Sequence, residues 1–329
     1  MPDLPARAER TLRLAVPLAV VLVLGAVFNQ GGAFFTWDTH RAVLGEVSVL
    51  GILACGMTVV VITGGIDLAV GSVLAVGAVA IALFTMPLGW PAPLALAAVL
   101  AMGAAAGATS GVLVGRSRMP AFVATLGMMV FARGLAKHLS DGKKVTRHFV
   151  DTAGEPRSVE LPGLFELLDS RVLGGQLSVV TLVLAACVAL TWVVLRKLSL
   201  GRHLYAVGGS VDAARLAGVP VRRTFVLAYA LSGLFAAIAG VCQAARETHG
   251  DPETGAGYEL DAIAMVVLGG ASLSGGRGGV GGTLVGVLTI GYLQKVLSLN
   301  AFSLEARLML TGAIVVGAVL LQLRTESRA

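Results

Sequence analysis

Long stretches without a charged side chain constrain this chain more than any other feature of its sequence. Arg13 to Asp38 encloses 24 uncharged residues, and Asp67 to Arg116 encloses 48. A helix needs about 20 apolar residues to cross a bilayer, because the hydrocarbon core is about 30 Å thick and a helix rises 1.5 Å per residue. These runs predict membrane-spanning helices, and the longest run predicts two of them joined by a hairpin rich in proline and glycine.

The sequence as a whole predicts an all-α polytopic membrane protein with one membrane domain over 1–329. Apolar residues make up 56% of the chain and charged residues 13%, which excludes a soluble enzyme and a disordered chain. Helices are expected because lipid offers the backbone no hydrogen-bond partner, and no alternating ten-residue strands of a barrel occur. About ten spans are predicted, at 14–28, 43–62, 70–86, 94–115, 120–139, 178–195, 224–245, 259–272, 280–296 and 306–323.

The distribution of basic residues predicts the orientation. With the N-terminus inside and ten spans, the inside loops hold 14 of the 25 Lys and Arg residues and 5 acids, a balance of +9 that leaves −3 for the rest. This asymmetry follows the positive-inside rule. Both termini are therefore expected in the cytoplasm, with a small folded cap at 140–177 outside, and the basic composition needs no nucleic-acid partner.

The predicted inside loop 196–223 contains the signals of a short helix. Ser210 is a typical N-cap, Asp212 suits the first turn, and Gly218 suits the position just after the last turn. These residues predict a helix over 211–217 at the cytoplasmic face.

Two readings of this short helix remain open at this point. Leu216 and Val219 give it an apolar patch, and Arg202, Arg222 and Arg223 flank it. An interfacial helix held by anionic lipid and a docking helix for a cytoplasmic partner both fit these residues.

Two glycine-rich segments interrupt predicted spans. Residues 64–71 and 269–276 share the pattern Gly-Gly-x-x-Leu-x-x-Gly. Matched broken spans in two halves of a chain indicate a transporter built by duplication, with its pathway at the repeat interface; the sequence leaves open whether the repeats are inverted or parallel. Asp67 in the first segment is either a functional intramembrane acid or a helix cap.

Catalytic and metal-binding motifs do not appear in the sequence. Residues 273–277 look like the signature of a cassette ATPase, but no Gly-x-x-x-x-Gly-Lys-Ser/Thr loop occurs and the match lies between spans. His249, Asp251 and Glu253 have loose spacing and are read as a solvated acidic loop. We therefore expect neither catalytic residues nor a metal site.

Five stretches in this order resemble the membrane permease subunits of bacterial ATP-binding-cassette importers for monosaccharides, the ribose/xylose/galactose group. They are 62–72, 120–128, 201–209, 213–219 and 254–264. The resemblance covers nearly the whole chain, and the loop 140–177 matches least. It implies a multi-pass protein of the bacterial inner membrane.

The resemblance also implies partners. In such importers a coupling helix with a Glu-Ala-Ala pattern docks on the ATPase, and here Asp212 replaces the Glu. The implied coupling residues are Asp212, Ala213, Ala214, Arg215, Leu216 and Gly218. The family architecture implies a second permease chain, a cytoplasmic cassette ATPase that uses ATP and magnesium, and a periplasmic sugar-binding protein. This chain itself is expected to bind no cofactor, and its pairing as a homodimer or heterodimer stays open.

A smooth, weakly selective pathway is expected, because the binding protein would select the sugar. The candidate pathway residues are Thr58, Thr63, Gly64, Gly65, Asp67, Thr125, Gln243, Gly269, Gly270 and Ser272; helix packing is the alternative role for the Thr and Gln residues. Two other functions stay open: an ion-coupled secondary transporter that relies on Asp67, and a permease of the same type for an autoinducer or a polyol.

Overall fold

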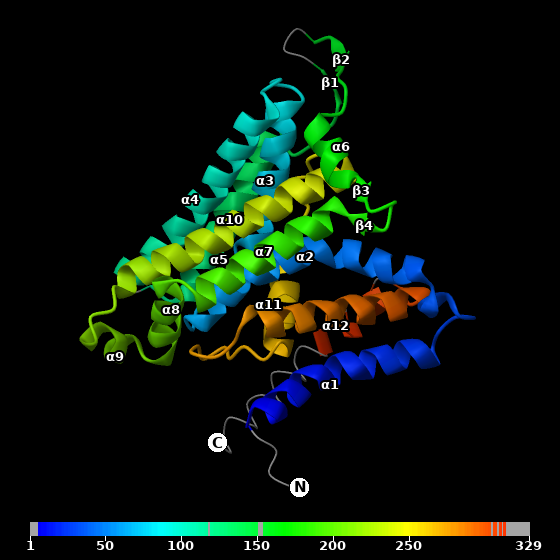
Figure 1. Cartoon of the computed structure of the whole chain (residues 1–329). Helices are drawn as coiled ribbons and strands as arrows, with labels where there is room; N and C mark the ends of the chain where they lie inside the picture. The colour runs from blue at the N-terminus through cyan, green and yellow to red at the C-terminus, as the bar shows by residue number, and fades with distance from the viewer. Residues whose placement is uncertain are drawn as a thin grey trace.

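A computed structural model describes residues 6–117, 119–150, 154–303, 305–307, 309–310 and 312–313 (Figure 1). The structure gives helices α1 (Ala6–Val27), η1 (Ala33–Phe35), α2 (Trp37–Ile62), α3 (Val70–Thr85), α4 (Ala92–Ser117), α5 (Ala121–Leu139), α6 (Gly163–Asp169), α7 (Val179–Arg196), α8 (Ser199–Gly209), α9 (Val211–Leu216), α10 (Val221–Glu247), α11 (Tyr258–Leu268) and α12 (Val280–Leu299). Four short strands are β1 (His148–Val150), β2 (Pro156–Ser158), β3 (Arg171–Val172) and β4 (Leu177–Ser178).

The predicted helical membrane fold is confirmed. Each predicted span from 14–28 to 280–296 falls on one helix, while 306–323 lies largely outside the described residues. Within the described part, 5 helices (α2, α4, α7, α10 and α12) are long and apolar enough to cross a membrane, and two apolar stretches, 15–27 and 70–85, are shorter. The exact number of ten spans stays a prediction.

The structure corrects the sequence prediction at two places. The predicted span 259–272 ends early, because α11 stops at Leu268 and the chain turns at Gly270, whose φ is 77°. The predicted loop 196–223 also contains α8, which the sequence reading missed. Leu200, Leu204 and Val207 face the protein at helical spacing, and this spacing was the signal that could have found it.

The loop 140–177 contains the only strands named in the described residues. β1 pairs with β2 and β3 pairs with β4, both antiparallel, with His148 opposite Ser158 and Arg171 opposite Ser178. The fold is therefore α-helical except for these two small hairpins. They lie with α6 at one end of the molecule, and α8 and α9 lie at the opposite end (Figure 1).

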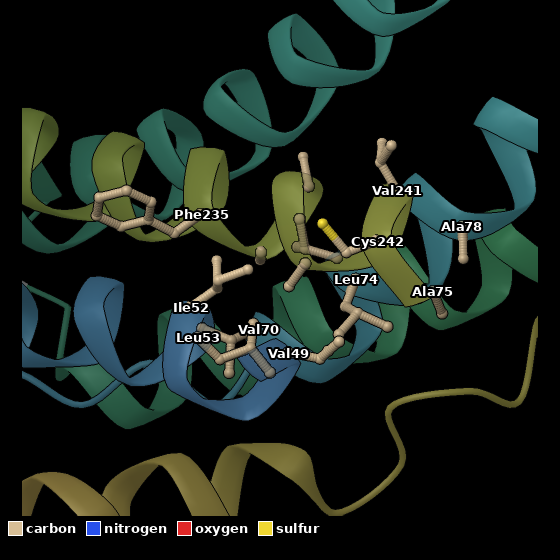
Figure 2. Close-up of a cluster of buried hydrophobic side chains, with 14 of the residues drawn as sticks. Val49, Ile52, Leu53, Val70, Leu74, Ala75, Ala78, Phe235, Val241 and Cys242 are labelled. Atoms are coloured by element: carbon tan, nitrogen blue, oxygen red, sulfur yellow. The ribbon is translucent and has the colours of Figure 1, made fainter. Parts of the chain in front are cut away.

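The core forms where α2, α3 and α10 meet. Figure 2 shows Ile52 and Leu53 of α2 packing toward Leu74 of α3 and toward Phe235 and Cys242 of α10. Most of the apolar window of α2, 89%, is buried by protein. A helix that is apolar all round must be covered on every side, and α2 is covered here by neighbouring helices.

The pair α4 and α10 packs at very close range. Four glycines of α4 recur every fourth residue, which places them on one face of the helix: Gly103, Gly107, Gly111 and Gly115. A Cβ at Gly111 would lie 2.6 Å from the Cα of Val226, so only glycine lets the two backbones approach this closely. Small residues at helix contacts are the usual means of tight packing in membranes.

Candidate functional site

The two glycine-rich connections that the sequence singled out meet in space. The N–H of Gly276 donates to the carbonyl of Ile62 over 2.9 Å, which joins the α11–α12 connection to the end of α2. Gly208 of α8 closes this contact from a third side, because a Cβ there would lie 2.5 Å from the nitrogen of Gly276. We call this contact of Ile62, Gly208 and Gly276 the glycine junction.

The two connections begin with the same turn. Gly64 after α2 and Gly270 after α11 have φ values of 78° and 77°, in the left-handed region that favours glycine. In both, the N–H that follows the glycine donates to the carbonyl five residues before it, over 3.2 Å. This is the hydrogen bond of a Schellman cap.

The register of the two turns corrects the sequence pattern by one residue. The shared pattern pairs Gly64 with Gly269, whereas the caps pair Gly64 with Gly270. The pattern holds further along: Asp67 Oδ1 accepts from the N–H two residues on over 3.0 Å, and Ser272 Oγ does the same over 3.3 Å. The two connections therefore share two local motifs with one extra residue between them in the first.

Asp67 is buried and closes the turn that leads into α3. Its side chain is 3% exposed, and its Oδ1 accepts from the N–H of Ala69 at the start of α3. Burial raises the pKa of this carboxyl to about 6, against the opposing effect of the hydrogen bonds that it accepts. Ser232 of α10 also lowers the pKa of this carboxyl, and its buried Oγ has no hydrogen-bond partner within the described part of the chain.

The backbone beside Asp67 is held by two further helices. The carbonyl of Ile66 accepts from Thr125 Oγ1 of α5 and from the hydroxyl of Tyr229 of α10, each over 3.3 Å. Tyr229 is fully buried. The α2–α3 connection is therefore fixed by α5, α10 and the glycine junction together.

The remaining predicted pathway residues lie in packed positions. Thr58 Oγ1 and Thr283 Oγ1 form a buried hydrogen bond of 2.6 Å between α2 and α12. Thr63 Oγ1 donates to its own helix at the carbonyl of Val60 over 2.7 Å, and the amide of Gln243 donates to Glu247 over 2.7 Å. These contacts are those of packing residues, and their pathway role stays a prediction.

At Gly65 and Gly269 a group from another helix approaches the glycine backbone closely. A Cβ at Gly65 would lie 2.5 Å from the hydroxyl of Tyr229, and one at Gly269 would overlap the backbone of Gly282 on α12. Neither residue, nor any other predicted pathway residue, lines the cavity between α4 and α10 or the cavity between α3, α4, α5 and α10.

The short helix of the loop 196–223 is α9, which begins at Val211 as predicted and ends at Leu216, one residue before the predicted end. The N–H of Ala213 donates to Ser210 Oγ over 3.2 Å, and Gly218 has φ 77° after the last turn. Asp212 and Arg215 form an exposed ion pair of 3.0 Å. Ala214 is the buried contact of the helix, in a cluster with residues of α2, α8 and α10.

The exposed face of α9 differs from the predicted apolar patch. Leu216 is 91% exposed, whereas Val219 packs partly against the cluster around Ala214. Val219 turns inward because its N–H donates to the carbonyl of Ala214 over 2.9 Å. The helix therefore exposes one large apolar side chain, Leu216, beside the Asp212–Arg215 pair and the small side chains of Ala213 and Ala217.

The acidic segment 246–261 is bound to α5 and the residues after it. Arg133 Nη1 donates to the carbonyls of Pro252 and Thr254 over 2.6 and 2.8 Å. Two ion pairs accompany these bonds: Lys137–Glu253 at 2.7 Å and Lys144–Asp251 at 3.1 Å. Burial disfavours the charged form of Asp251, but the N–H of Glu253 and Lys144 outweigh it and hold the pKa below its usual value. The acids thus take separate partners.

Sequence reasoning missed three residues that hold this region together. Gly208, Tyr229 and Thr283 contact the two glycine-rich connections or the helices that flank them. Tyr229 and Thr283 lie in runs that read as ordinary membrane helix, and Gly208 lies in the predicted loop 196–223. The sequence signal for Gly208 was its pairing with Gly209 at the end of an amphipathic stretch. Nothing in the sequence distinguishes Tyr229 or Thr283 from other helix residues.

Comparisons with known proteins match nearly the whole chain. The sequence model of the family described as "Branched-chain amino acid transport system / permease component" matches residues 40–319. The ribose import permease protein RbsC of Escherichia coli is 39% identical over 303 residues, 92% of this chain and 91% of the relative. The L-arabinose transport system permease protein AraH of Escherichia coli is 34% identical, covering 93% and 88% of the two chains. The fructose import permease protein FrcC of Rhizobium meliloti is also 34% identical, covering 93% and 84%. No solved structure matches.

Proposed function

The chain belongs to the family of the branched-chain amino acid transport system permease component, and we propose that it is the membrane subunit of an ATP-driven importer of a monosaccharide. The observation that carries this proposal is the match of over nine tenths of the chain to permeases named for ribose import, L-arabinose transport and fructose import. The helical fold with its apolar spans agrees with a multi-pass protein of the inner membrane.

A sugar is a better cargo for this chain than the amino acids in the family description. The three relatives named above, which match over nine tenths of this chain, are named for ribose, L-arabinose and fructose import or transport. Amino acids appear only in the description of the whole family. A permease of the same type for an autoinducer or a polyol is the alternative cargo.

We place the ATPase contact on α9. Its exposed face combines the ion pair of Asp212 and Arg215 with the projecting Leu216, and its buried face is anchored through Ala214. A single exposed apolar side chain with charges around it suits insertion into a pocket of a partner. ATP and magnesium would be bound and used by that partner, and a sugar-binding protein would approach the opposite end, where β1–β4 lie (Figure 1).

The rest of the assembly follows from the same proposal. Two permease chains would enclose the pathway between them, with both termini of each in the cytoplasm. The glycine junction supports coupling to that pathway, because it joins α8, which precedes α9, to the connections at the ends of α2 and α11. Most candidate pathway residues lie in or beside these connections, and a movement of α9 would reach them through these backbone contacts. Gln243 lies apart from them, near the other end of α10.

Affinity purification of tagged variants with the cassette ATPase tests the proposal. The test variant carries Asp212→Lys and Leu216→Asp on α9. The matched control carries Glu166→Lys and Leu167→Asp on α6, which repeats the same charge and polarity changes on exposed residues at the other end of the molecule. We expect the α9 variant to lose the ATPase and sugar import, and the α6 variant to retain the ATPase.

Two results would contradict the proposal. Retention of the ATPase by the α9 variant, at unchanged thermal stability, would remove α9 as the docking helix. Sugar uptake by the purified chain alone in vesicles with an ion gradient, without any ATPase, would favour the ion-coupled transporter and a coupling role for Asp67.

A further inference from the structure

A groove with three arginines lies where the ends of α4 and α10 meet. It encloses a cavity of 390 Å³. Its walls come from two helices only, and they are Val112, Arg116, Arg222, Arg223, Val226 and Leu227. The groove lies at the end of the molecule that also carries α8 and α9 (Figure 1).

Close helix packing brings the three arginines together. Gly115 ends the glycine face of α4, and a Cβ there would lie 3.1 Å from the carbonyl oxygen of Arg222. The next residue of α4 is Arg116, in the last turn of the helix, while Arg222 and Arg223 are in the first turn of α10. Backbone contact therefore brings the three arginines to one place, where all of them line the same cavity.

This cluster has no negative partner in the part of the chain that the structure describes. The ion pairs found there join other residues, and Asp212, the acid of the neighbouring α9, pairs with Arg215. The first turn of α10 adds positive potential, because it contains no acid and Pro220 provides no side-chain cap. Like charges in this arrangement repel one another, and a bound anion would relieve the repulsion.

The other half of the groove is apolar and faces outward. Val112 and Leu227 are 42% and 47% exposed, and they lie one turn further into the apolar stretches of α4 and α10 than the arginines. A ligand that fits must therefore be anionic at the end of the helices and apolar along their sides. We propose that the groove binds an anionic phospholipid, with its phosphate on Arg116, Arg222 and Arg223 and an acyl chain along Val112, Val226 and Leu227.

Another cavity in the described part of the molecule has an apolar lining. It measures 410 Å³, lies between α3, α4, α5 and α10, and has no charged residue in its lining. A lipid tail fits such a lining, but nothing there would select a headgroup. Arginine binds phosphate through a planar fork of donors, and basic pockets between membrane helices are typical headgroup sites. The arginine groove therefore has the selectivity that the apolar cavity lacks.

Native mass spectrometry of the purified full chain with phosphatidylglycerol or phosphatidylcholine tests this inference. The test variant is Arg116→Gln with Arg222→Gln and Arg223→Gln. The matched control is Arg196→Gln with Arg202→Gln and Arg277→Gln, which removes the same charge from exposed residues outside the groove. Wild type and the control are expected to prefer phosphatidylglycerol, and the test variant is expected to bind it about tenfold or more weakly.

Three outcomes would overturn the proposal. Equal loss in both triple variants would indicate a general charge effect, and no loss in the test variant would place the lipid elsewhere. Displacement of the lipid by excess inorganic phosphate, with no dependence on acyl chains, would make the groove a site for free phosphate. If the test variant unfolds, wild-type protein is crosslinked with a photoactivatable phosphatidylglycerol instead. Crosslinks are expected within 112–116 and 222–227. Crosslinks confined to other segments would contradict the assignment.

Discussion

Gly208→Ala is the sharpest perturbation of the glycine junction. The new methyl group would overlap the carbonyl oxygen of Ile62 and lie 2.5 Å from the nitrogen of Gly276, closer than real Cβ atoms approach other heavy atoms. All these neighbours are backbone atoms, so no flexible side chain can move away. Either α8 shifts outward, or the hydrogen bond between Gly276 and Ile62 breaks.

The expected cost follows from these contacts. Overpacking costs about 1–3 kcal/mol, and leaving the buried N–H of Gly276 without its acceptor costs about 1–3 kcal/mol. Alanine recovers about 1 kcal/mol relative to glycine inside a helix. Because one or the other cost applies, the net loss is up to about 2 kcal/mol, concentrated where α8 contacts the two connections.

Gly209→Ala is the matched control, because a Cβ there meets nothing within 4 Å. Thermal unfolding in detergent and sugar import with the partner ATPase are measured for both variants. Gly208→Ala should lower the melting temperature and slow import while the ATPase still co-purifies, since the exposed face of α9 is untouched. The same melting temperature and import rate in both variants would refute the close contact and its role in coupling.

Three further changes test other contacts. Asp67→Asn keeps an acceptor for the N–H of Ala69 and should raise the free energy of unfolding at pH 7 by up to about 3 kcal/mol. The wild-type carboxyl has a folded pKa of about 6, above its unfolded value. Wild type is therefore most stable below about pH 4 and loses stability as the pH rises through about 6. Melting temperatures of both proteins from pH 4 to 8 check this, and a wild-type curve as flat as that of the variant would contradict it. Ser210→Ala removes the N-cap of α9 and should cost about 1 kcal/mol locally, seen as faster hydrogen exchange at the amides of α9; unchanged exchange would mean that the cap contributes nothing. Thr58→Val breaks the hydroxyl pair with Thr283 and should lower the melting temperature by the equivalent of about 1 kcal/mol with unchanged apparent KM for import; a raised KM at unchanged stability would instead place Thr58 in the pathway.

The sequence was informative wherever one physical requirement dominates. Charge-free runs located the membrane helices, because burying a charge in lipid is costly. Ser210 and Gly218 located the ends of α9, since caps act through local hydrogen bonds. Both kinds of signal depend on residues close in sequence.

Contacts between distant segments were not readable in the same way. The pattern shared by 64–71 and 269–276 indicated two related turns, but their register and the insertion of Gly208 depend on how α2, α8 and α12 pack. Val219 was predicted to lie in the apolar patch of α9, but the turn after Ala217 directs its side chain back to the protein. Asp67 received two readings: its Oδ1 does bond to the N–H of Ala69 just ahead of α3, and a functional role for this buried acid stays a prediction.

The early end of α11 has a consequence for how far this helix extends across a bilayer. Its 11 residues extend about 16 Å, roughly half the hydrocarbon core of a bilayer. Beyond Leu268 the chain continues as turns whose N–H groups bond to protein carbonyls, such as Gly276 to Ile62 and Ser272 to Arg277 at 3.1 Å. Helix α11 therefore covers about half of the distance that a spanning helix covers, and the backbone that follows it is satisfied by hydrogen bonds to other parts of the protein.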